Sequence, residues 1–255
     1  MSEQILSVSG VELALGGTPI LNGVELNITS GETVGVIGPN GSGKTTLFNC
    51  ISGFHVPNQG RIEFKGKDIT NTPAFRRARL GLGRVFQNFA IFKEMTVIEN
   101  VVVALEGNGV LGYTFFPWNK KTKLYFDRAY AYLEKVGLEG KASLKAASLS
   151  GGQMRLLEIV RTLAFGAELF LLDEPTAGVS PKMKGDIAGL IKLLQEDGKT
   201  IVVIEHDINF IQKFCTRIVV LDQGRVVLDD TPENVRKSPM LQEVYFGNEK
   251  PAQNQ

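Results

Sequence analysis

The feature that most restricts the fold is a phosphate-loop pattern at residues 38–45, which read GPNGSGKT and fit the consensus GxxxxGK[ST]. An apolar stretch at 33–37 precedes the pattern, and a helical stretch at 44–52 follows it. Glycines let a backbone curl until successive N–H groups face one phosphate, and the N-terminus of the following helix adds positive partial charge. The sequence therefore predicts an α/β fold in which a strand, this loop and a helix hold the phosphates of a nucleotide.

Two side chains at the end of the loop have specific expected roles. We expect Lys44 to reach the β- and γ-phosphates, and Thr45 to offer its hydroxyl group to Mg²⁺. The predicted nucleotide-binding residues of this segment are Gly38, Pro39, Asn40, Gly41, Ser42, Gly43, Lys44, Thr45 and Thr46. GTPases, kinases, helicases and transporters all contain such a loop, so the loop alone does not identify the reaction.

Two acidic residues follow a second apolar stretch, which reads LFLL at 169–172. A buried strand that ends in Asp173 would place that carboxylate beside the phosphate loop, where it could hold Mg²⁺ largely through water. Glu174 would then polarise the water that attacks the γ-phosphate. The alternative is an ordinary strand end with two solvated acids, and the presence of the phosphate loop favours the catalytic interpretation.

His206 follows a third apolar stretch, at 200–205. A lone histidine is more often structural or solvated. Its position at the carboxyl end of a predicted strand favours a contact with the γ-phosphate instead. We therefore expect His206 to be catalytic together with Lys44 and Glu174.

A second anion-binding pattern, LSGGQ, occupies residues 149–153 in front of a helical stretch. Ser150 suits a helix N-cap, and Gly151 and Gly152 expose backbone N–H groups at the positive end of that helix. One nucleotide does not need two complete phosphate cradles. The simplest interpretation is a head-to-tail dimer, in which four residues of one chain cover the γ-phosphate bound by the other: Ser150, Gly151, Gly152 and Gln153.

In motif order and spacing, essentially the whole chain resembles the ATP-binding cassette (ABC) family. The resemblance implies that Gln87, within RVFQN at 84–88, belongs to the glutamine loop, which ligates Mg²⁺ and links the catalytic core to a helical subdomain. It implies that 177–180 cross the dimer interface and that His206 is the switch histidine. Gln87 thus joins the expected catalytic residues, and the expected metal ligands are Thr45, Gln87 and Asp173.

The resemblance also implies an architecture. It is a P-loop NTPase (RecA-like) core with an N-terminal antiparallel β-subdomain and an inserted helical subdomain. The strand–helix–strand alternation of the later sequence independently favours a parallel or mixed sheet covered by helices. We expect a single nucleotide-binding domain over 1–255: a core of about 1–87 and 166–230, a helical subdomain of about 88–165, and a C-terminal tail of about 231–255.

Two positions depart from the common family pattern. Leu15 stands where an aromatic residue usually stacks on adenine, so we expect the base to be covered by van der Waals contact without stacking. Ser180 stands where Asp or Asn is usual, and its hydroxyl can still hydrogen-bond across the interface with less reach. Neither change removes a phosphate-binding or catalytic group, so an active ATPase with ATP and Mg²⁺ as ligands is expected.

Several stretches resemble the ATP-binding subunits of branched-chain amino acid importers. They are 38–44 with Ser42, 84–88, 92–100, 204–207, 231–235 and 244–249. The implied function is ATP hydrolysis that energises import of branched-chain or other neutral amino acids by ATP-driven closure of the dimer. Urea importers and lipopolysaccharide- or lipid-extracting systems share much of this pattern and remain alternatives, and a soluble non-transport ATPase is a weaker one.

The expected partners follow from the resemblance and from composition. With 28 Lys and Arg against 27 Asp and Glu, the chain lacks the basic excess of a nucleic-acid binder. No apolar run approaches the roughly 18–20 residues that span a bilayer, and no signal peptide is visible. We expect two transmembrane permease subunits, a second ATPase subunit (a paralogue or another copy) and, indirectly, an extracytoplasmic substrate-binding protein. The chain would be peripheral, on the cytoplasmic face of the inner or plasma membrane.

One further contact is expected from the family. Phe89 or Phe92 would line a groove that receives a cytoplasmic helix of the membrane subunit. The alternative is that these aromatic residues serve the core of the helical subdomain.

Overall fold

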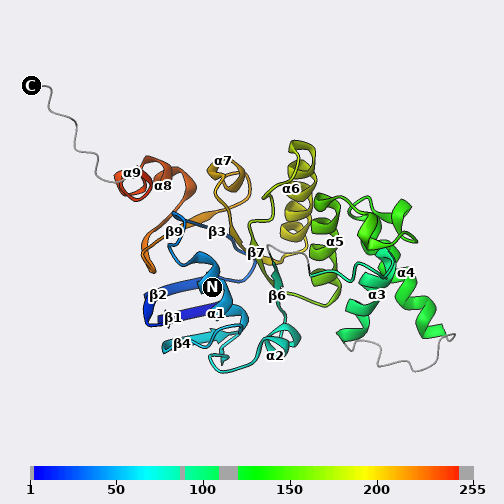
Figure 1. Ribbon diagram of the computed structural model, residues 1–255, viewed down its shortest axis with the longest axis horizontal. Coiled ribbons are helices and arrows are strands. Elements are labelled where there is room, and N and C mark those ends of the chain that lie inside the picture. The colour runs from blue at the N-terminus through cyan, green and yellow to red at the C-terminus, as the bar shows by residue number, and fades with distance from the viewer. Residues whose placement is uncertain (1–2, 87–89, 109–119, 247–255) are drawn as a thin grey trace, which may run out of the picture. The chain divides into compact units, whose positions relative to one another are not determined.

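The computed structural model describes residues 3–86, 90–108 and 120–246 (Figure 1). The chain forms two compact units. The first comprises residues 1–74 and 201–255, and the second comprises residues 75–200. The phosphate loop belongs to the first unit and the LSGGQ segment to the second. The subdomain boundaries expected from the sequence stay predictions.

The first unit contains an antiparallel sheet with the strand order β2-β1-β4-β5. Its strands are β1 (Gln4–Leu15), β2 (Thr18–Thr29), β4 (Gln59–Phe64) and β5 (Lys67–Asp68). Gly16 and Gly17, at φ 56° and 83°, make the tight turn between β1 and β2 that a side chain would disfavour. The predicted N-terminal antiparallel β-subdomain is confirmed.

A second layer of this unit is mostly parallel. It contains β3 (Thr33–Ile37), β8 (Thr200–Ile204), β9 (Arg217–Asp222) and β10 (Arg225–Asp230) in the order β10-β9-β3-β8. β3 pairs in parallel with both β8 and β9, and β9 and β10 form an antiparallel hairpin. Every residue of β3 and β8 is buried, as expected for parallel strands covered on both faces.

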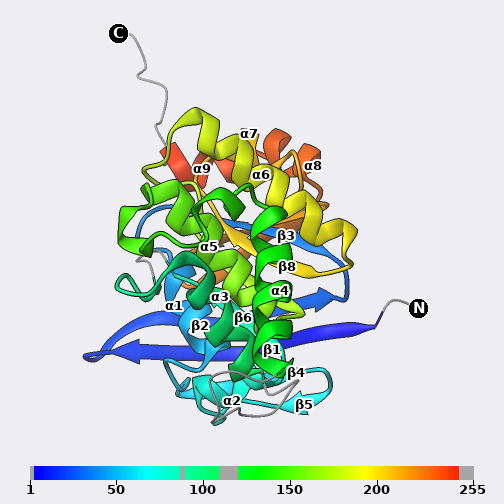
Figure 2. The ribbon, with the colours of Figure 1, turned by 90° about the vertical axis from the view of Figure 1, so that its right-hand side faces the viewer.

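Within its described residues, the first unit has four helices. They are α1 (Lys44–Ser52), α7 (Ile208–Ile211), α8 (Pro232–Lys237) and α9 (Pro239–Phe246). Packing against β3 is close: a Cβ atom on Gly35 would lie 2.6 Å from Cγ2 of Ile211 in α7. α8 packs on β9 and β10. It also contacts α9, and the two helices lie side by side next to the β9–β10 hairpin (Figures 1 and 2).

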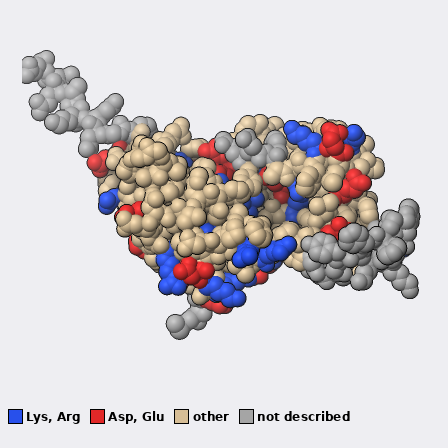
Figure 3. All heavy atoms as spheres, turned by 60° about the horizontal axis from the view of Figure 1, so that its bottom comes forward, with Lys and Arg blue, Asp and Glu red and all other residues tan. Residues whose placement is uncertain are grey.

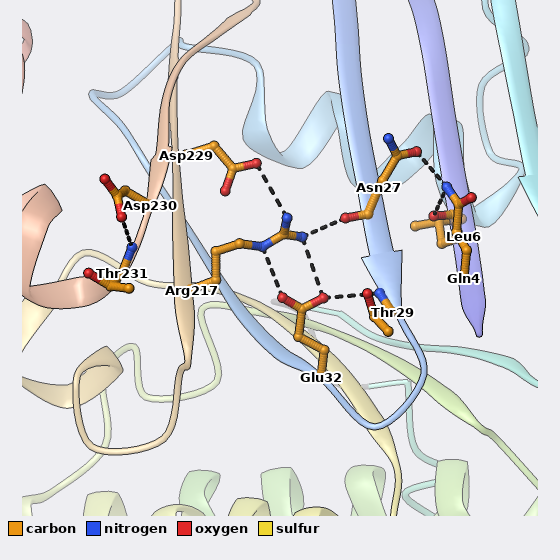
Figure 4. A network of polar contacts seen from close by, with 9 residues as sticks. All are labelled: Gln4, Leu6, Asn27, Thr29, Glu32, Arg217, Asp229, Asp230 and Thr231. Carbon is orange, nitrogen blue, oxygen red and sulfur yellow. Dashed lines mark hydrogen bonds and ion pairs between the residues drawn. The ribbon is translucent and has the colours of Figure 1, made fainter. Parts of the chain in front are cut away.

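A polar network holds the two sheets of the first unit together (Figure 4). Arg217 of β9 forms ion pairs with Glu32 at 2.9 Å and with Asp229 of β10 at 3.5 Å, and it donates to the backbone oxygen of Asn27 in β2. Glu32 also accepts the N–H of Thr29 at 3.0 Å. One guanidinium group thus connects the end of β2, the turn before β3 and the terminal hairpin.

The second unit pairs β6 (Leu82–Val85) in parallel with β7 (Leu169–Asp173). Its helices are α2 (Ala74–Arg79), α3 (Val97–Gly107), α4 (Lys120–Glu134), α5 (Gly151–Ala164) and α6 (Pro181–Glu196), with short 3₁₀ turns at Glu139–Lys141 and Ala146–Ser148. α3, α4 and α5 pack on one another, and α5 also packs on α6 and β6.

Local sequence signals set the ends of these helices. α3 begins with a capping box in which Thr96 and Glu99 each bond the other's backbone N–H. α6 begins at Ser180, whose hydroxyl accepts the N–H of Met183 at 3.3 Å, and Pro181 occupies the first turn. Ser180 therefore has a structural role as an N-cap, in addition to the interface role expected for it.

The surface agrees with the balanced composition. In the view of Figure 3, acidic and basic side chains lie interspersed among a majority of uncharged residues. Among the helices that the structure describes, none is long and apolar enough to cross a bilayer.

Candidate nucleotide site

The phosphate loop joins the buried end of β3 to the first residue of α1, as the sequence predicts. Gly38, Gly41 and Gly43 have φ values of 152°, 82° and 103°. A Cβ atom on Gly38 would lie 2.0 Å from the backbone oxygen of Leu221, so only glycine fits there. The hairpin turn supports the loop as well, because Gly224 donates its N–H to the backbone oxygen of Ser42 at 3.0 Å.

Lys44 places a positive charge inside this loop. Its ammonium group donates to the backbone oxygens of Gly38 at 2.8 Å and Pro39 at 2.9 Å, and the side chain is only 6% exposed. The first turn of α1 contains no acidic residue, so the positive helix end is not neutralised from within the turn. Thr45 is exposed and Thr46 half-buried at the start of α1. A cation, a helix N-terminus and curled glycine backbone together fit a polyphosphate group.

His206 lies at the same edge of the parallel layer as the phosphate loop. β8 and β3 are parallel neighbours with Val36 paired to Ile204, so their carboxyl ends meet on one side of the sheet. His206 is exposed directly after β8, and Asp207 then caps α7 by accepting the N–H of Phe210 at 3.1 Å. His206 thus lies at the surface, at the edge where the phosphate loop also begins.

Leu15, the residue expected to cover the base, is 41% exposed at the end of β1. It pairs with Thr18 across the tight turn to β2. An exposed leucine at this place offers a small apolar surface and no aromatic ring.

In the second unit, Asp173 ends β7 and is 2% exposed. Its Oδ2 atom lies 2.8 Å from Nη2 of Arg84 on the neighbouring strand β6, and both side chains are at most 5% exposed. Burial lowers the pKa of Arg84, while the charge of Asp173 opposes that shift. Arg84 was not among the expected site residues. An arginine inside a short strand gives no sequence signal of its own, because its partner lies 89 residues away.

Glu174 follows directly in an unusual backbone conformation. Its φ is 47°, in the left-handed region, and its backbone oxygen accepts the N–H of Ala177 at 3.1 Å. A residue other than glycine in this region costs on the order of 1–3 kcal/mol. The half-buried Glu174 is thus held at a sharp turn where the strand ends, and such strain often occurs at functional sites.

The LSGGQ segment forms the predicted helix N-terminus, and Ser150 is confirmed as its N-cap. Ser150 Oγ accepts the N–H of Gln153 at 3.4 Å, while Gln153 Oε1 accepts the N–H of Ser150 at 3.1 Å. Gly152 is packed against α6, where a Cβ atom would lie 2.5 Å from Cε of Met183. Gly152 thus permits close packing of α5 on α6. Because neither Gly151 nor Gly152 has a side chain, neither covers the positive end of α5.

Gln87 and Phe89 lie outside the described residues, but α5 holds the residues on either side of them. Glu158 Oε1 accepts the N–H of Phe86 at 3.2 Å and that of Ala90 at 3.3 Å. Arg155 donates to the backbone oxygen of Phe86 and pairs with Glu158 at 2.8 Å, and both side chains are at most 4% exposed. Burial raises the pKa of Glu158, and the charge of Arg155 opposes the rise.

A cavity of about 360 Å³ lies beside these residues in the second unit. Phe92, which is 47% exposed, lines it together with Arg84, Glu158, Arg161 and Phe165. The guanidinium of Arg161 lies 4.9 Å from the centre of the Phe92 ring. This cavity lies at the segment where the groove is expected, and the groove and its occupant stay predictions.

Comparison with known proteins gives one family. A family model described as ABC transporter matches residues 21–177. The high-affinity branched-chain amino acid transport ATP-binding protein BraF of Pseudomonas aeruginosa is 40% identical over 253 residues, covering 97% of this chain and 99% of that protein. LivG of Escherichia coli, described in the same words, is 38% identical over 255 residues with the same coverage.

Solved structures agree. A crystal structure of an ATP-binding cassette of an ABC transporter in its ADP conformation has a TM-score of 0.83 and 33% identity, covering 96% of this chain and 99% of that one. A dimeric cassette bound to ADP and phosphate has a TM-score of 0.78 and 31% identity, covering 89% and 99%. Together with the phosphate loop and the capped LSGGQ helix, these likenesses show that the chain belongs to the ABC transporter family, as one of its ATP-hydrolysing cassettes.

Proposed function

We propose that this cassette energises the import of branched-chain or other neutral amino acids. Similarity to BraF and LivG along nearly the whole chain supports the substrate class. The observation that carries the nucleotide site is the buried ammonium of Lys44, which the curled glycine loop holds at the start of a helix.

Each unit supplies part of the proposed chemistry. The phosphate loop and Lys44 bind the phosphates of ATP, and Leu15 covers the base. Thr45, Gln87 and Asp173 are proposed to hold Mg²⁺, which would neutralise part of the phosphate charge. Hydroxyl, amide and carboxylate oxygens are the ligands that this ion prefers.

Two further side chains act on the γ-phosphate in this proposal. Glu174 accepts a proton from the attacking water, and a base in such a role typically contributes about 10²–10⁴-fold to the rate. His206 contacts the γ-phosphate from the end of β8. The exposure of His206 and the strained turn at Glu174 support these roles.

The productive form is proposed to be a head-to-tail dimer. Ser150, Gly151, Gly152 and Gln153 would cover the ATP bound by the partner, with Ser180 at the same interface. The exposure of Ser150 and Gly151 at the positive end of α5 and the dimeric relative with bound ADP and phosphate support this arrangement. Closure of the dimer on ATP and its reopening after hydrolysis would supply the work.

The proposed partners are two permease subunits, a second ATPase subunit and, indirectly, an extracytoplasmic substrate-binding protein. The chain would be peripheral on the cytoplasmic face of the membrane. Its relatives are described as transport ATP-binding proteins, and the cavity beside Phe92 offers a place for a permease segment. Urea import or lipid extraction would use the same nucleotide site, so the transported molecule decides between them.

Uptake measurements test this proposal. Cells whose only copy carries Lys44→Ala would be compared with wild type for uptake of labelled leucine, alanine and urea. Lys192→Ala serves as a matched control, because Lys192 is 73% exposed on α6 and forms only a loose pair with Glu196. Loss of leucine or alanine uptake with urea uptake intact supports the proposal. If Lys44→Ala abolishes ATP hydrolysis in the purified chain but changes none of the three uptakes, the amino acid assignment is wrong.

A further inference from the structure

The last helix of the described chain reaches the phosphate loop. The phenol oxygen of Tyr245, in α9, accepts a hydrogen bond from the backbone N–H of Gly38 at 3.0 Å. The two residues are 207 positions apart, and both belong to the first unit. None of the roles proposed for ATP binding or hydrolysis uses Tyr245.

The position of Gly38 explains why its N–H group needs this acceptor. The ladder between β3 and β9 ends with the pair Ile37 and Val220, so Gly38 lies just beyond it. The residue is buried, and its Cβ position is enclosed by the backbone oxygen of Leu221 and by Ser42 Oγ. A buried N–H group without an acceptor is costly, and Tyr245 supplies the acceptor that the strand does not.

The other polar group of Gly38 holds Lys44. The backbone oxygen of Gly38 accepts a hydrogen bond from the Lys44 ammonium at 2.8 Å. Gly38 is therefore fixed on one side by Tyr245 and on the other by the lysine expected to bind phosphate. A shift of this glycine would move the oxygen that positions the ammonium group.

The tail that carries Tyr245 is anchored on the strand that also borders the loop. Asp230, at the end of β10, accepts the N–H of Thr231 at 2.6 Å and a side-chain N–H of Asn234 at 2.9 Å, which fixes the start of α8. Val235 is fully buried where α8 packs on β9 and β10, and Leu241 of α9 is 9% exposed. β9 also pairs with β3, so the tail and the loop share one support (Figure 1).

The chemistry of the side chain suits the contact. Tyr245 is half-buried, and this burial raises the pKa of its phenol, so the group stays neutral at physiological pH. A neutral phenol oxygen accepts an N–H hydrogen bond while the ring provides apolar packing. Replacement by phenylalanine would remove only the acceptor.

We infer that Tyr245 is a positioning residue of the nucleotide site, which fixes the first peptide of the phosphate loop and thereby links docking of the C-terminal helix to binding of ATP. This inference rests on the proposed role of the loop. By linkage, an ordered tail tightens ATP binding and bound ATP stabilises the docked tail to the same extent.

Binding of a non-hydrolysable ATP analogue with Mg²⁺ to the purified full chain tests the inference by calorimetry. Tyr245→Phe should raise the dissociation constant roughly two- to tenfold, as expected for the loss of one hydrogen bond. Tyr130→Phe removes the same atom from an exposed tyrosine on α4 and should bind like wild type. Urea unfolding of both variants, measured in parallel, separates positioning from general destabilisation.

Hydrogen exchange supplies the second readout. In wild type, the analogue should slow exchange in α9, and this protection should be weaker in Tyr245→Phe. If Tyr245→Phe leaves the dissociation constant unchanged and the analogue does not affect exchange in α9, the inference is overturned while the proposed nucleotide site stands. An equal loss of affinity in Tyr130→Phe also overturns it. If wild type does not bind the analogue, or binds it no better than Lys44→Ala does, the proposed nucleotide site fails and the inference fails with it.

Discussion

Removing Arg84 should destabilise the chain far more than removing a surface lysine. Arg84 and Asp173 form an ion pair at 2.8 Å with side chains that are 5% and 3% exposed. Arg84→Met keeps most of the volume but leaves the Asp173 carboxylate without this cation. Breaking a buried pair from one side typically costs about 3–5 kcal/mol. For a chain of this size, that lowers the melting temperature by on the order of 10 °C.

A double-mutant cycle separates the pair from the packing around it. Urea unfolding would be followed by circular dichroism for Arg84→Met, for Asp173→Leu and for the double variant. The double variant should regain much of the stability lost in Arg84→Met, because replacing both charges by apolar groups is often close to neutral. The control is Lys135→Met, which breaks a 3.3 Å pair with Asp197 whose side chains are both 45% exposed. It should cost less than about 1 kcal/mol. A loss below about 1 kcal/mol for Arg84→Met, or no recovery in the double variant, would refute the reasoning.

Three further predictions follow from the first unit and from the LSGGQ helix. Gly38→Ala should abolish ATP binding measured by calorimetry, because the new Cβ would lie 2.0 Å from the backbone oxygen of Leu221, whereas Gly140→Ala, which has open space around it and no positive φ, should bind normally. Burial raises the pKa of Cys215 to about 12 from 9.0, so iodoacetamide at pH 8 should label it far more slowly in the native protein than in urea, as mass spectrometry would show. Because the thiol ionises more easily in the unfolded chain, its contribution to the free energy of unfolding is full below pH 9 and is lost as the pH rises from 9 towards 12. A urea unfolding midpoint that does not change over that range would contradict this prediction. Ser150→Ala should cost about 1 kcal/mol in urea unfolding through loss of the N-cap and should also slow ATP hydrolysis; unchanged stability would argue against the cap.

The elements around the nucleotide motifs could be predicted because their signals are local. The apolar stretches at 33–37 and 169–173 became β3 and β7, and the serine of LSGGQ became the N-cap of α5. Each of these depends on neighbours within a few residues, such as a glycine turn or a cap. Local sequence carries that information.

The missed features depend on partners far away in the sequence. The sequence pattern does not predict β6, because two of its four residues, Gly83 and Arg84, interrupt the apolar run that is typical of a buried strand. A Cβ atom on Gly83 would lie 2.3 Å from Cγ2 of Thr162, and Arg84 is neutralised by Asp173. Glu158 looks like a solvated helix residue, yet it is 3% exposed because the backbone of another segment supplies its donors.

α5 connects the LSGGQ segment to the backbone of Phe86 and Ala90 through one continuous helix. Ser150 caps its N-terminus, and about two turns later Glu158 accepts hydrogen bonds from the backbone N–H groups of Phe86 and Ala90. At a rise of 1.5 Å per residue, Ser150 and Glu158 are roughly 12 Å apart along the helix. A tilt of α5 by about 10° about its N-terminus would therefore displace Glu158 by about 2 Å. A rigid-body tilt of α5 at its N-terminus would therefore also displace the side chain that bonds the backbone of Phe86 and Ala90.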